Sequence, residues 1–510
     1  MISRVRTVAF FGLELKEVDV QVHFSKGIPG LVIVGLVSKT VAEAKERIRA
    51  AISSAGFSFP AKRIIVNLAP ADFLKEGTRF DLPIALAILM GMGVIDSDDV
   101  GNSIVLGELS LDGNICSVRG VLPVGVYAAQ KGYKLICPYH NRLECVLLDK
   151  KLPIIVSSNL NNLISLLKDK QFQFSSDFSN TSSDDSDLNS VFIPDMASVR
   201  GQSVAKRAVI IAACGGHNIL LSGHPGTGKS MLASAFSGIL PPLTHDEIIE
   251  VTSIYSLSGL IKDGNFISKR PYRAPHHSAS DVSIVGGGRA GQLGEITLAH
   301  KGVLFLDELP EFDRKVLDSL RQPLENGSIS IARADYRVSY PAKFQLFAAM
   351  NQCKCGYFGD AARQCRKVPQ CGRDYESKVS GPIMDRFDIV VQIETEIEAL
   401  YSEQEQFAKT SKDIRSDVAK VREIQALRYK ADGLDARLNS ELSKPSIDKH
   451  CILCQESKDV VQKYVDKFGL SMRGYAKVLK IARTIADMEG LSSIKKDNII
   501  ESLNYRRRAI

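Results

Sequence analysis

One glycine-rich octapeptide constrains this chain more than any other stretch, because it fits a single kind of local structure. It follows an apolar run at residues 219–221 and precedes a helical pattern at residues 231–240. A strand, a glycine-rich loop and a helix N-terminus in this order form a cradle of backbone N–H groups for phosphate oxygens. The octapeptide comprises Gly223, His224, Pro225, Gly226, Thr227, Gly228, Lys229 and Ser230. The pattern predicts a nucleoside triphosphate site in which Lys229 contacts the β- and γ-phosphates and Ser230 binds Mg²⁺.

Two further apolar runs end in polar side chains suited to the same site. Residues 302–306 lead into Asp307 and Glu308, and residues 343–350 lead into Asn351. Downstream of a phosphate loop, we expect Asp307 to hold Mg²⁺ through water and Glu308 to orient and deprotonate the attacking water. The Asn351 amide can hold the same water. An isolated strand that ends in surface acids is the ordinary alternative to this interpretation.

Two arginines are candidates for contact with the γ-phosphate. Arg386 lies between two aspartates in residues 380–388, and Arg473 opens a helical pattern. A guanidinium brought to the γ-phosphate stabilises transition-state charge and increases the rate by about 10³–10⁵ when it is supplied as a finger. A surface salt bridge is the alternative for both side chains. Arg373 and Arg366 lie close to Arg386 in the sequence and are alternative fingers.

Length and composition indicate a soluble protein of several domains. A chain of 510 residues with 45% hydrophobic and 24% charged residues suits two or three domains of ~100–200 residues each. The most apolar run, residues 82–94, contains Pro83 and is shorter than the ~20 residues of a membrane helix, so we expect a buried helix there. No signal-peptide core follows the first residues. We therefore expect a cytoplasmic protein with no membrane partner.

The amino-terminal third of the chain alternates short strand and helix patterns. A helical pattern at residues 41–52 is followed by a strand at 63–68, a helix from Asp81 and a hairpin at 105–115. The Asp112-Gly113 pair is a strong hairpin-turn signal. The pattern predicts an α+β domain over residues 1–170. A polar, serine- and aspartate-rich stretch follows, and it predicts a flexible linker at residues 171–190.

This first domain resembles the proteolytic domain of Lon-type proteases, which has the fold called ribosomal protein S5 domain 2-like. Residues 75–77 match the family's Lys-x-Gly loop, but Arg79 stands where the family has its nucleophilic serine. Pro123 stands at or near the position of the family's lysine. Because a serine–lysine dyad needs a hydroxyl and an amine that can lose its proton, we expect an inactive domain. Thr78 as a substitute nucleophile is the alternative.

The order of motifs after the linker resembles the AAA+ ATPases, and the wording between motifs resembles the magnesium-chelatase ATPase-subunit clade. The matching stretches are residues 273–278, 285–288, 294–302 and 305–312. With the Lon-like domain in front, nearly the whole chain resembles the YifB/ComM family. The resemblance implies a multidomain α/β protein: a Lon-like domain at 1–170, a linker at 171–190, an AAA+ P-loop α/β core at 191–395, and a helical lid at 396–510.

The same resemblance assigns roles to the candidate residues and to the whole protein. It implies that Lys229 and Ser230 form the Walker A site and that Asp307 and Glu308 form Walker B. Asn351 then corresponds to sensor 1, Arg386 to the finger and Arg473 to sensor 2. The family implies a homohexameric, ATP- and Mg²⁺-dependent ring motor that acts on DNA by branch migration or a helicase-like activity, in recombination or natural transformation. A protein partner could dock on the amino-terminal domain.

A protein-remodelling ATPase, chelatase-like or unfoldase-like, is the alternative function. A DNA motor needs basic side chains in its central pore, whereas a common type of unfoldase grips its substrate with an exposed aromatic. Tyr272 and Tyr336 keep the second function open. The net charge of +7 is compatible with a polyanionic partner but does not decide between the two. The basic residues that favour DNA are Lys269, Arg270, Arg273, Arg289, Arg333 and Arg337.

Cysteines and histidines raise the question of a second metal. Four thiols, Cys353, Cys355, Cys365 and Cys371, lie between Asn351 and the predicted finger. Four cysteines satisfy tetrahedral Zn²⁺, and a loop of this length has no core of its own, so we expect a structural zinc. The spacing departs from paired C-x₂-C, which leaves free thiols or redox chemistry as alternatives. For His276 and His277 we expect loop packing, with a metal or catalytic role as the alternative.

Overall fold

The computed structural model of the chain divides into two compact units. It describes residues 2–178, 193–261, 265–288, 292–332, 337–356, 358, 367–393, 409–468 and 470–506. Unit 1 comprises Met1–Ser190 and Thr244–Ser268, and unit 2 comprises Val191–Leu243 and Lys269–Ile510. Each unit has its own hydrophobic cores.

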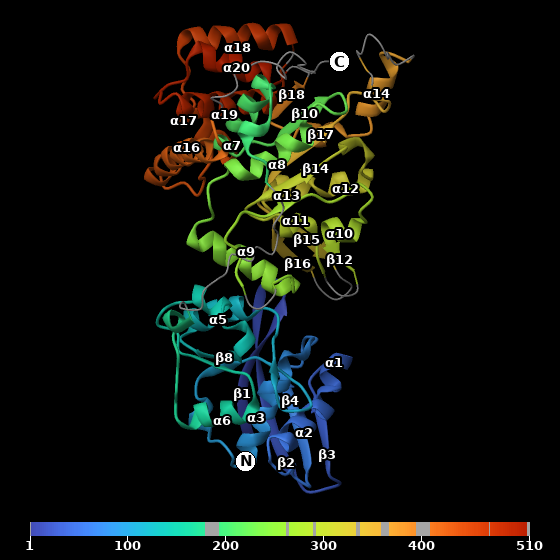
Figure 1. Cartoon of the computed structure of the whole chain (residues 1–510), viewed down its shortest axis with the longest axis vertical. Coiled ribbons are helices and arrows are strands. Elements are labelled where there is room, and N and C mark those ends of the chain that lie inside the picture. Colours follow the sequence, from blue (N-terminus) through green and yellow to red (C-terminus); the bar gives the residue numbers. More distant parts are fainter. Residues whose placement is uncertain are drawn as a thin grey trace. The chain divides into compact units, whose positions relative to one another are not determined.

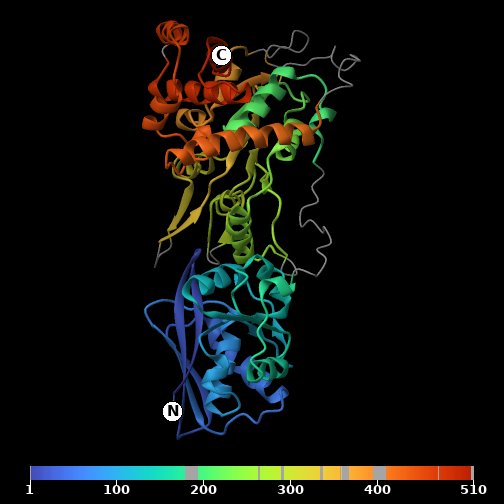
Figure 2. The same cartoon turned by 90° about the vertical axis from the view of Figure 1, so that its left-hand side faces the viewer.

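Unit 1 is built on a mixed seven-stranded sheet with the order β3-β4-β2-β1-β5-β8-β9 (Figures 1 and 2). β2 pairs antiparallel with β1 and β4, and the remaining neighbours in this sheet pair in parallel. A separate hairpin joins β6 and β7. The strands are β1 (Ile2–Phe11), β2 (Glu14–Ser25), β3 (Gly30–Val34), β4 (Arg63–Ala69), β5 (Ser103–Val105), β6 (Glu108–Leu109), β7 (Ile115–Cys116), β8 (Lys134–Pro138) and β9 (Ile154–Ser157).

The central helix of unit 1 is α3, which packs against β1 and β2. Residues 82–89 of this helix are all buried, which explains why this run is apolar on every side, and the buried Asp81 before it pairs with Arg47. The helices of unit 1 are α1 (Lys39–Ala42), α2 (Ala44–Ser54), α3 (Asp81–Gly91), α4 (Ser97–Val100), α5 (Val121–Lys131), α6 (Leu160–Lys168) and α9 (His245–Ser258). Short 3₁₀ helices are η1 (Thr78–Phe80), η2 (Tyr139–Asn141), η3 (Glu144–Leu147) and η4 (Ser175–Phe178).

The structure confirms the predicted strand at 63–68, the helix from Asp81 and the turn at Asp112-Gly113, and it divides the predicted helix at 41–52 into α1 and α2. The helix from Asp81 is α3, and the Asp112-Gly113 turn joins β6 to β7. The chain stays packed beyond residue 170, because Gln173 pairs with Ile154 and Phe178 is buried. The rest of the predicted linker, residues 179–190, lies outside the described residues. The predicted domain limits and the likeness to Lon-type proteases stay predictions.

Helix α9 belongs to unit 1 although it follows the phosphate-loop helix in the sequence. It packs against α5, and its Ser256 hydroxyl donates a 2.6 Å hydrogen bond to the buried carboxylate of Glu144. Burial raises the pKa of Glu144, while the hydrogen bonds from Ser256, Asn141 and the backbone of Leu122 oppose that shift. No local pattern in the sequence indicates this return of the chain to unit 1.

Unit 2 is built on a five-stranded sheet in which every strand pair is parallel, with the order β11-β14-β17-β10-β18. Because the carboxyl ends of parallel strands meet at one edge, the polar residues that follow them are brought together there. Two hairpins, β12–β13 and β15–β16, lie outside this sheet. The strands are β10 (Ile219–Gly223), β11 (Tyr272–Arg273), β12 (Gly286–Gly287), β13 (Gln292–Leu293), β14 (Val303–Leu306), β15 (Ser328–Ala332), β16 (Arg337–Pro341), β17 (Gln345–Met350) and β18 (Ile389–Ile393).

The helices of unit 2 cover this sheet and then build a separate small core near the carboxyl end, around the buried Tyr429. The longer ones are α7 (Ser203–Gly215), α8 (Lys229–Ile239), α14 (Gln370–Glu376), α16 (Ser411–Ala431), α17 (Lys444–His450), α18 (Gln455–Phe468), α19 (Met472–Met488) and α20 (Lys496–Asn504). The shorter ones are α10 (Asp281–Val285), α11 (Glu295–Leu298), α12 (Arg314–Ser319), α13 (Arg321–Asn326), α15 (Gly381–Met384), η5 (Met196–Ser198), η6 (Leu309–Glu311) and η9 (Asn439–Glu441). This parallel α/β sheet fits the predicted phosphate-loop core.

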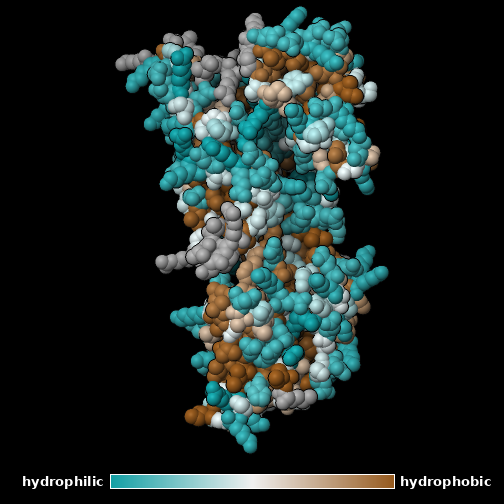
Figure 3. Space-filling model, turned by 180° about the vertical axis from the view of Figure 1, so that it is seen from behind, coloured by the Kyte–Doolittle hydropathy of each residue, from teal (hydrophilic) through white to brown (hydrophobic). Residues whose placement is uncertain are grey.

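Exposed hydrophobic side chains gather at particular places on the surface. None of the described helices combines the length and apolarity needed to cross a bilayer. Figure 3 shows hydrophobic residues gathered on part of unit 1. Along its edge strand, Val32 and Val34 alternate with less exposed residues, and they remain 42% and 41% exposed. An edge strand with exposed apolar side chains is a surface suited to contact with another protein.

Candidate nucleotide site

The predicted phosphate loop lies between the end of β10 and the start of α8, as its sequence requires. Gly228 caps α8 with φ +85°, a conformation that disfavours any other residue. Gly223 must also lack a side chain, because a Cβ there would lie 2.4 Å from the carbonyl oxygen of Ile393 on β18. The loop is further held by Thr227, whose hydroxyl donates to the His224 carbonyl at 2.9 Å. The loop therefore has the shape of a phosphate cradle.

Lys229 is buried and points back across this loop. Its Nζ donates to the carbonyl oxygens of Gly223 at 3.0 Å and His224 at 2.7 Å, and to Asn351 Oδ1 at 3.2 Å. Burial lowers the pKa of Lys229, although the charge of Asp307 acts in the opposite direction. The carbonyl oxygens that accept from this ammonium are neutral. A phosphate in the cradle would give it an anionic partner. The predicted Lys229 and Asn351 thus meet at one point.

Ser230 and Asp307 are joined directly. The Ser230 hydroxyl donates to Asp307 Oδ2 at 2.7 Å, from the first turn of α8 to the end of β14. Both groups offer oxygen ligands, which is the donor set that Mg²⁺ prefers. The other oxygen, Asp307 Oδ1, accepts the backbone N–H of Glu308 at 2.9 Å, which fixes the plane of the carboxylate. These residues fit the predicted magnesium site.

Glu308 turns out of the strand into solvent beside a histidine. Its backbone has φ +52°, an uncommon conformation for a residue other than glycine. Its side chain is 51% exposed, and Oε2 lies 3.3 Å from Nδ1 of His277. The His277 ring also packs on His276, with the ring centres 4.1 Å apart. The loop packing predicted for the histidines is present, but the contact with Glu308 was missed because the two residues lie far apart in the sequence.

The candidate arginines occupy different surroundings. The Arg386 guanidinium pairs with Glu325 on α13, and its side chain is only 14% exposed. Arg373 on α14 and Arg473 in the first turn of α19 are exposed. Arg366 lies outside the described residues. The salt bridge was the alternative interpretation of Arg386; the finger and sensor roles stay predictions.

A partly buried ion pair joins α19 to Asp388, directly before β18. Lys477 Nζ lies 2.9 Å from Asp388 Oδ1, and the two side chains are 17% and 13% exposed. Lys477 also donates to the backbone carbonyl of Phe387 at 3.0 Å. Burial favours a higher pKa of Asp388, but the charges of Lys477 and His217 hold it well below its usual range. This pair positions the helix that carries Arg473.

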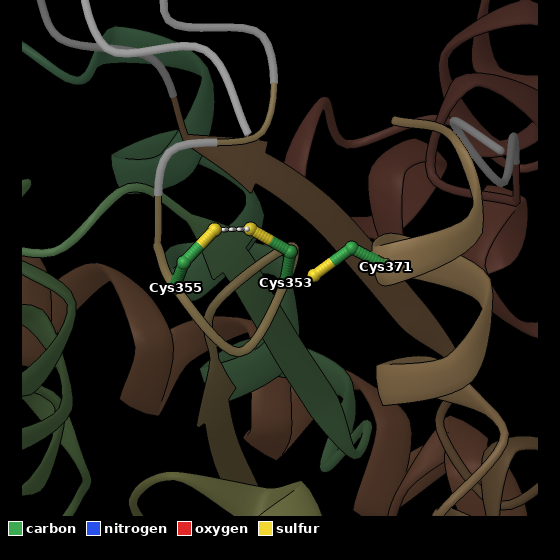
Figure 4. Close-up of side chains that lie close together, drawn as sticks. All are labelled: Cys353, Cys355 and Cys371. Carbon is green, nitrogen blue, oxygen red and sulfur yellow. Dashed lines mark hydrogen bonds between the residues drawn. The ribbon is translucent and has the colours of Figure 1, made fainter. Parts of the chain in front are cut away.

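Three of the four predicted zinc ligands lie together beside this site. The sulfur atoms of Cys353, Cys355 and Cys371 all lie within 4.8 Å of one another and can hold a metal ion (Figure 4). Cys353 Sγ and Cys355 Sγ are 3.1 Å apart. Cys365, the fourth predicted ligand, lies outside the described residues.

Three side chains that were expected to distinguish a DNA motor from an unfoldase make contacts within unit 2. Arg273 donates to both carboxylate oxygens of Glu295, at 2.5 and 2.6 Å. Arg270 donates to three backbone carbonyls of residues 241, 242 and 301. Tyr272 stacks on Phe305, and burial raises its pKa to about 12.

The guanidinium groups of Arg270 and Arg273 therefore have partners within unit 2, and Tyr272 packs within the same unit. All three side chains are half-buried. Contact of Arg270 and Arg273 with DNA, or of Tyr272 with a protein substrate, stays a prediction. Arg289, Arg333 and Tyr336 lie outside the described residues, as does the side chain of Arg337. Lys269 is exposed.

In unit 1, the residues of the Lon-like loop are held by other groups. Thr78 Oγ1 donates to Glu108 Oε2 at 2.5 Å. Lys75 is buried, and its Nζ donates to the Phe73 carbonyl at 2.9 Å and to the Pro70 carbonyl. The Arg79 guanidinium lies over the ring of Phe10, and burial lowers its pKa to about 10. Pro123 lies in the first turn of α5.

Comparison with protein families finds three matches that together span most of the chain. Residues 195–400 match the family described as "Magnesium chelatase, subunit ChlI". Residues 20–141 match "Subunit ChlI of Mg-chelatase", and residues 408–506 match "Magnesium chelatase, subunit ChlI C-terminal". The first match includes the phosphate loop, Asp307, Glu308 and Asn351.

Individual relatives match over nearly their full length. "Competence protein ComM" of Haemophilus influenzae is 41% identical over 500 residues, which cover 98% of this chain and 96% of the relative. "Uncharacterized protein YifB" of Salmonella typhimurium is 38% identical over 505 residues, covering 98% of this chain and 96% of the relative. The protein of the same name in Escherichia coli is 38% identical over 505 residues, covering 99% and 97%.

Proposed function

The chain belongs to the YifB/ComM family of magnesium-chelatase-like ATPases, and from this premise we propose that it is an ATP-driven ring motor that acts on DNA. The observation that carries the ATPase part is the hydrogen-bonded set of Lys229, Asn351, Ser230 and Asp307 at one edge of the parallel sheet. A phosphate cradle, a cation and two magnesium ligands in one place serve phosphoryl transfer.

In the proposed function, nucleotide binding mainly changes the partners of Lys229. Lys229 exchanges its contacts with the loop carbonyls for the β- and γ-phosphates, while the carboxylate plane of Asp307 stays fixed by the Glu308 N–H. Ser230 and Asp307 would hold Mg²⁺, and the ion would neutralise charge on the phosphate oxygens. Asn351 keeps contact with Lys229 and presents its amide to the attacking water.

Glu308 accepts the proton of that water. A general base must be held within reach of the proton that it accepts. The contact of Glu308 Oε2 with His277 restrains the position of the carboxylate. His277 follows β11, which neighbours β14 in the sheet. The loop after β11 therefore orients the base without contacting phosphate itself, and His277 is a positioning residue.

We further propose that neighbouring subunits complete the site in a homohexamer, where an arginine from one subunit reaches the γ-phosphate of the next. An arginine that reaches a neighbouring subunit must be accessible on the surface, and Arg373 is exposed. Arg386 would first have to break its ion pair with Glu325. Arg473 on α19 would report nucleotide state to the carboxyl-terminal helices, in the role of a sensor. A cytoplasmic location is part of the same proposal.

Action on DNA rests on the family resemblance and on one relative's name, a competence protein. The described residues supply Lys269 as an exposed basic side chain before β11. The protein-remodelling alternative loses support, because its described aromatic, Tyr272, is packed against Phe305. Recombination or natural transformation is the process that we propose for the motor.

The amino-terminal domain is proposed as an inactive scaffold. Thr78 is bound to Glu108, and the nearest loop amine, Lys75, is bound to backbone carbonyls. Neither Arg79 nor Pro123 can form a dyad. The exposed apolar edge at Val32 and Val34 suits contact with a protein partner.

A branch-migration assay tests the proposed function. We expect the purified protein to move the branch point of a labelled four-way DNA junction in the presence of ATP and Mg²⁺. The Lys229→Ala variant should fail, because it loses triphosphate binding. ATP hydrolysis without any movement of DNA junctions or forks would reject the DNA part and leave the ATPase part standing.

A further inference from the structure

We propose that Cys353, Cys355 and Cys371 hold a zinc ion that braces the phosphate loop, so that metal occupancy sets the affinity for nucleotide. The inference rests on the proposed function, because it takes residues 223–230 as the nucleotide site. The inference adds a zinc ion that supports the phosphate loop. It also makes the affinity for nucleotide depend on that ion.

The three thiols have the spacing of a zinc centre. Tetrahedral zinc with Zn–S bonds of about 2.3 Å places its sulfur ligands about 3.8 Å apart. The separations here begin at 3.1 Å, between Cys353 and Cys355, and stay within 4.8 Å. Figure 4 shows Cys353 and Cys355 on one loop with their sulfur atoms turned toward each other, and Cys371 on α14 with its sulfur atom directed to the side of Cys353. Small side-chain shifts are enough to close this set on one ion.

The chemistry of Cys353 also favours a cation. Its side chain is fully buried. Zinc binds cysteine as the thiolate and takes the place of the thiol protons. A thiol in a purely apolar core would not have two further thiols within reach.

The loop that carries these thiols contacts the phosphate loop directly. A turn is closed by the Gly356 N–H, which donates to the Cys353 carbonyl at 3.0 Å. The Gly356 carbonyl then accepts Nδ1–H of His224 at 3.0 Å. A Cβ on Gly356 would lie 2.7 Å from Cγ of Pro225, so the two loops are in close contact. Cys353 also follows Asn351 by only two positions, and Asn351 contacts Lys229.

The other side of the cluster is fixed to a helix. Cys371 lies in the first turn of α14. A Cβ on Gly372 would lie 3.2 Å from the Gln352 carbonyl, which places the helix against the same loop. A metal held between Cys371 and the Cys353–Cys355 turn therefore links α14 to the loop, and the loop holds His224 and Pro225 in place. Loss of the metal removes that link.

The first experiment measures metal. Protein purified without chelator should contain about one zinc per chain by elemental analysis. Exchange for Co²⁺ should give a thiolate-to-cobalt charge-transfer band. Cys355→Ser should lower the zinc content and weaken this band, and it leaves the fold intact because Cys355 is exposed. Cys454→Ser, at an exposed cysteine in the carboxyl-terminal part of unit 2, is the matched control and should change neither readout.

The second experiment measures nucleotide affinity without hydrolysis. The Kd of Mg-ADP is determined by calorimetry for the zinc-loaded protein and for protein stripped with a chelator and returned to magnesium buffer. We expect the stripped protein and Cys355→Ser to bind about threefold to tenfold more weakly, the range for loss of one hydrogen bond.

Two results would overturn the inference: protein that binds Mg-ADP but holds no zinc or cobalt, or zinc whose removal leaves the Kd unchanged. A Cys353–Cys355 disulfide in freshly purified protein would count as the first. Failure of the proposed function is distinguishable, because it would appear as zinc-loaded wild-type protein that does not bind Mg-ADP.

Discussion

The ion pair between Asp388 and Lys477 allows a quantitative test of how α19 is held. We predict that Asp388→Asn loosens this helix. Breaking a buried pair by removing one charge costs about 3–5 kcal/mol. Here both side chains keep 13–17% exposure, and asparagine can still accept the N–H of Asn218, which Asp388 accepts at 3.2 Å. We therefore expect a loss of about 2–3 kcal/mol, equivalent to a roughly 30- to 150-fold larger opening constant.

Hydrogen exchange read by mass spectrometry measures this opening in α19, with α3 of unit 1 as the internal reference. Asp417→Asn is the matched control. Its partner Lys409 lies 2.8 Å away, but the two side chains are 69% and 48% exposed, so we expect a change of about 0–1 kcal/mol. Protection of α19 that stays within about twofold of wild type in Asp388→Asn would refute the reasoning.

The pH dependence of the same protection has a defined sign. The folded-state pKa of Asp388 lies below the unfolded value of about 3.9. Its contribution to stability is therefore complete above that value and is lost as the pH falls below it. The difference in α19 protection between wild type and Asp388→Asn should shrink on acidification from neutral pH to below about pH 3.9. A constant difference at all pH values would contradict the assignment of the charge.

Three further predictions concern the site and unit 1. Glu308→Gln should keep the Kd for ATP but slow hydrolysis by about 10²–10⁴-fold, as expected for loss of a general base; phosphate release at the wild-type rate would remove Glu308 from this role. His277→Ala should lower kcat and leave nucleotide Kd unchanged, whereas His276→Ala, whose ring Nδ1 pairs with Ser278, should have a smaller effect; equal effects would argue against positioning by His277. Full-length protein should not degrade casein with ATP, and cleavage that is abolished by Thr78→Ala would show an active protease.

Mixing experiments identify the arginine that acts between subunits. Increasing fractions of Arg373→Ala or Arg386→Ala subunits are added to wild type, and ATPase activity is measured. The variant that lacks the finger should suppress activity out of proportion to its fraction, because each missing side chain disables a neighbour. A linear decline for both variants would indicate that neither acts in trans.

Local patterns predicted the centre of the candidate site. The phosphate loop, Asp307 and Asn351 each follow an apolar run that forms a strand, and the chain order of these runs is visible in the sequence. Parallel pairing then brings the strand ends together, which is why Lys229 contacts Asn351 and Ser230 contacts Asp307. The buried helix α3 was predictable for a similar reason, since its run is apolar at every position.

Contacts between distant residues could not be predicted in this way. The pair of His277 with Glu308, the engagement of Arg273 by Glu295 and the stacking of Tyr272 on Phe305 depend on tertiary packing and leave no periodic signal. The placement of α9 in unit 1 likewise rests on contacts across a long sequence separation, namely its packing against α5 and the hydrogen bond from Ser256 to the buried carboxylate of Glu144. The basic residues near β11 indicated DNA contacts, and the hydrogen bonds that Arg270 and Arg273 make within unit 2 could not be predicted from them.

The most direct test of the central claim is steady-state ATPase activity measured with and without branched DNA at stated salt. We expect DNA to stimulate hydrolysis by the wild-type protein, and the DNA concentration needed for half-stimulation to rise steeply between about 50 and 200 mM salt as phosphate contacts weaken. Glu308→Gln should show no stimulated activity. ATPase activity that ignores DNA at every salt concentration but increases with an unfolded protein would contradict the account and favour a protein-remodelling ATPase.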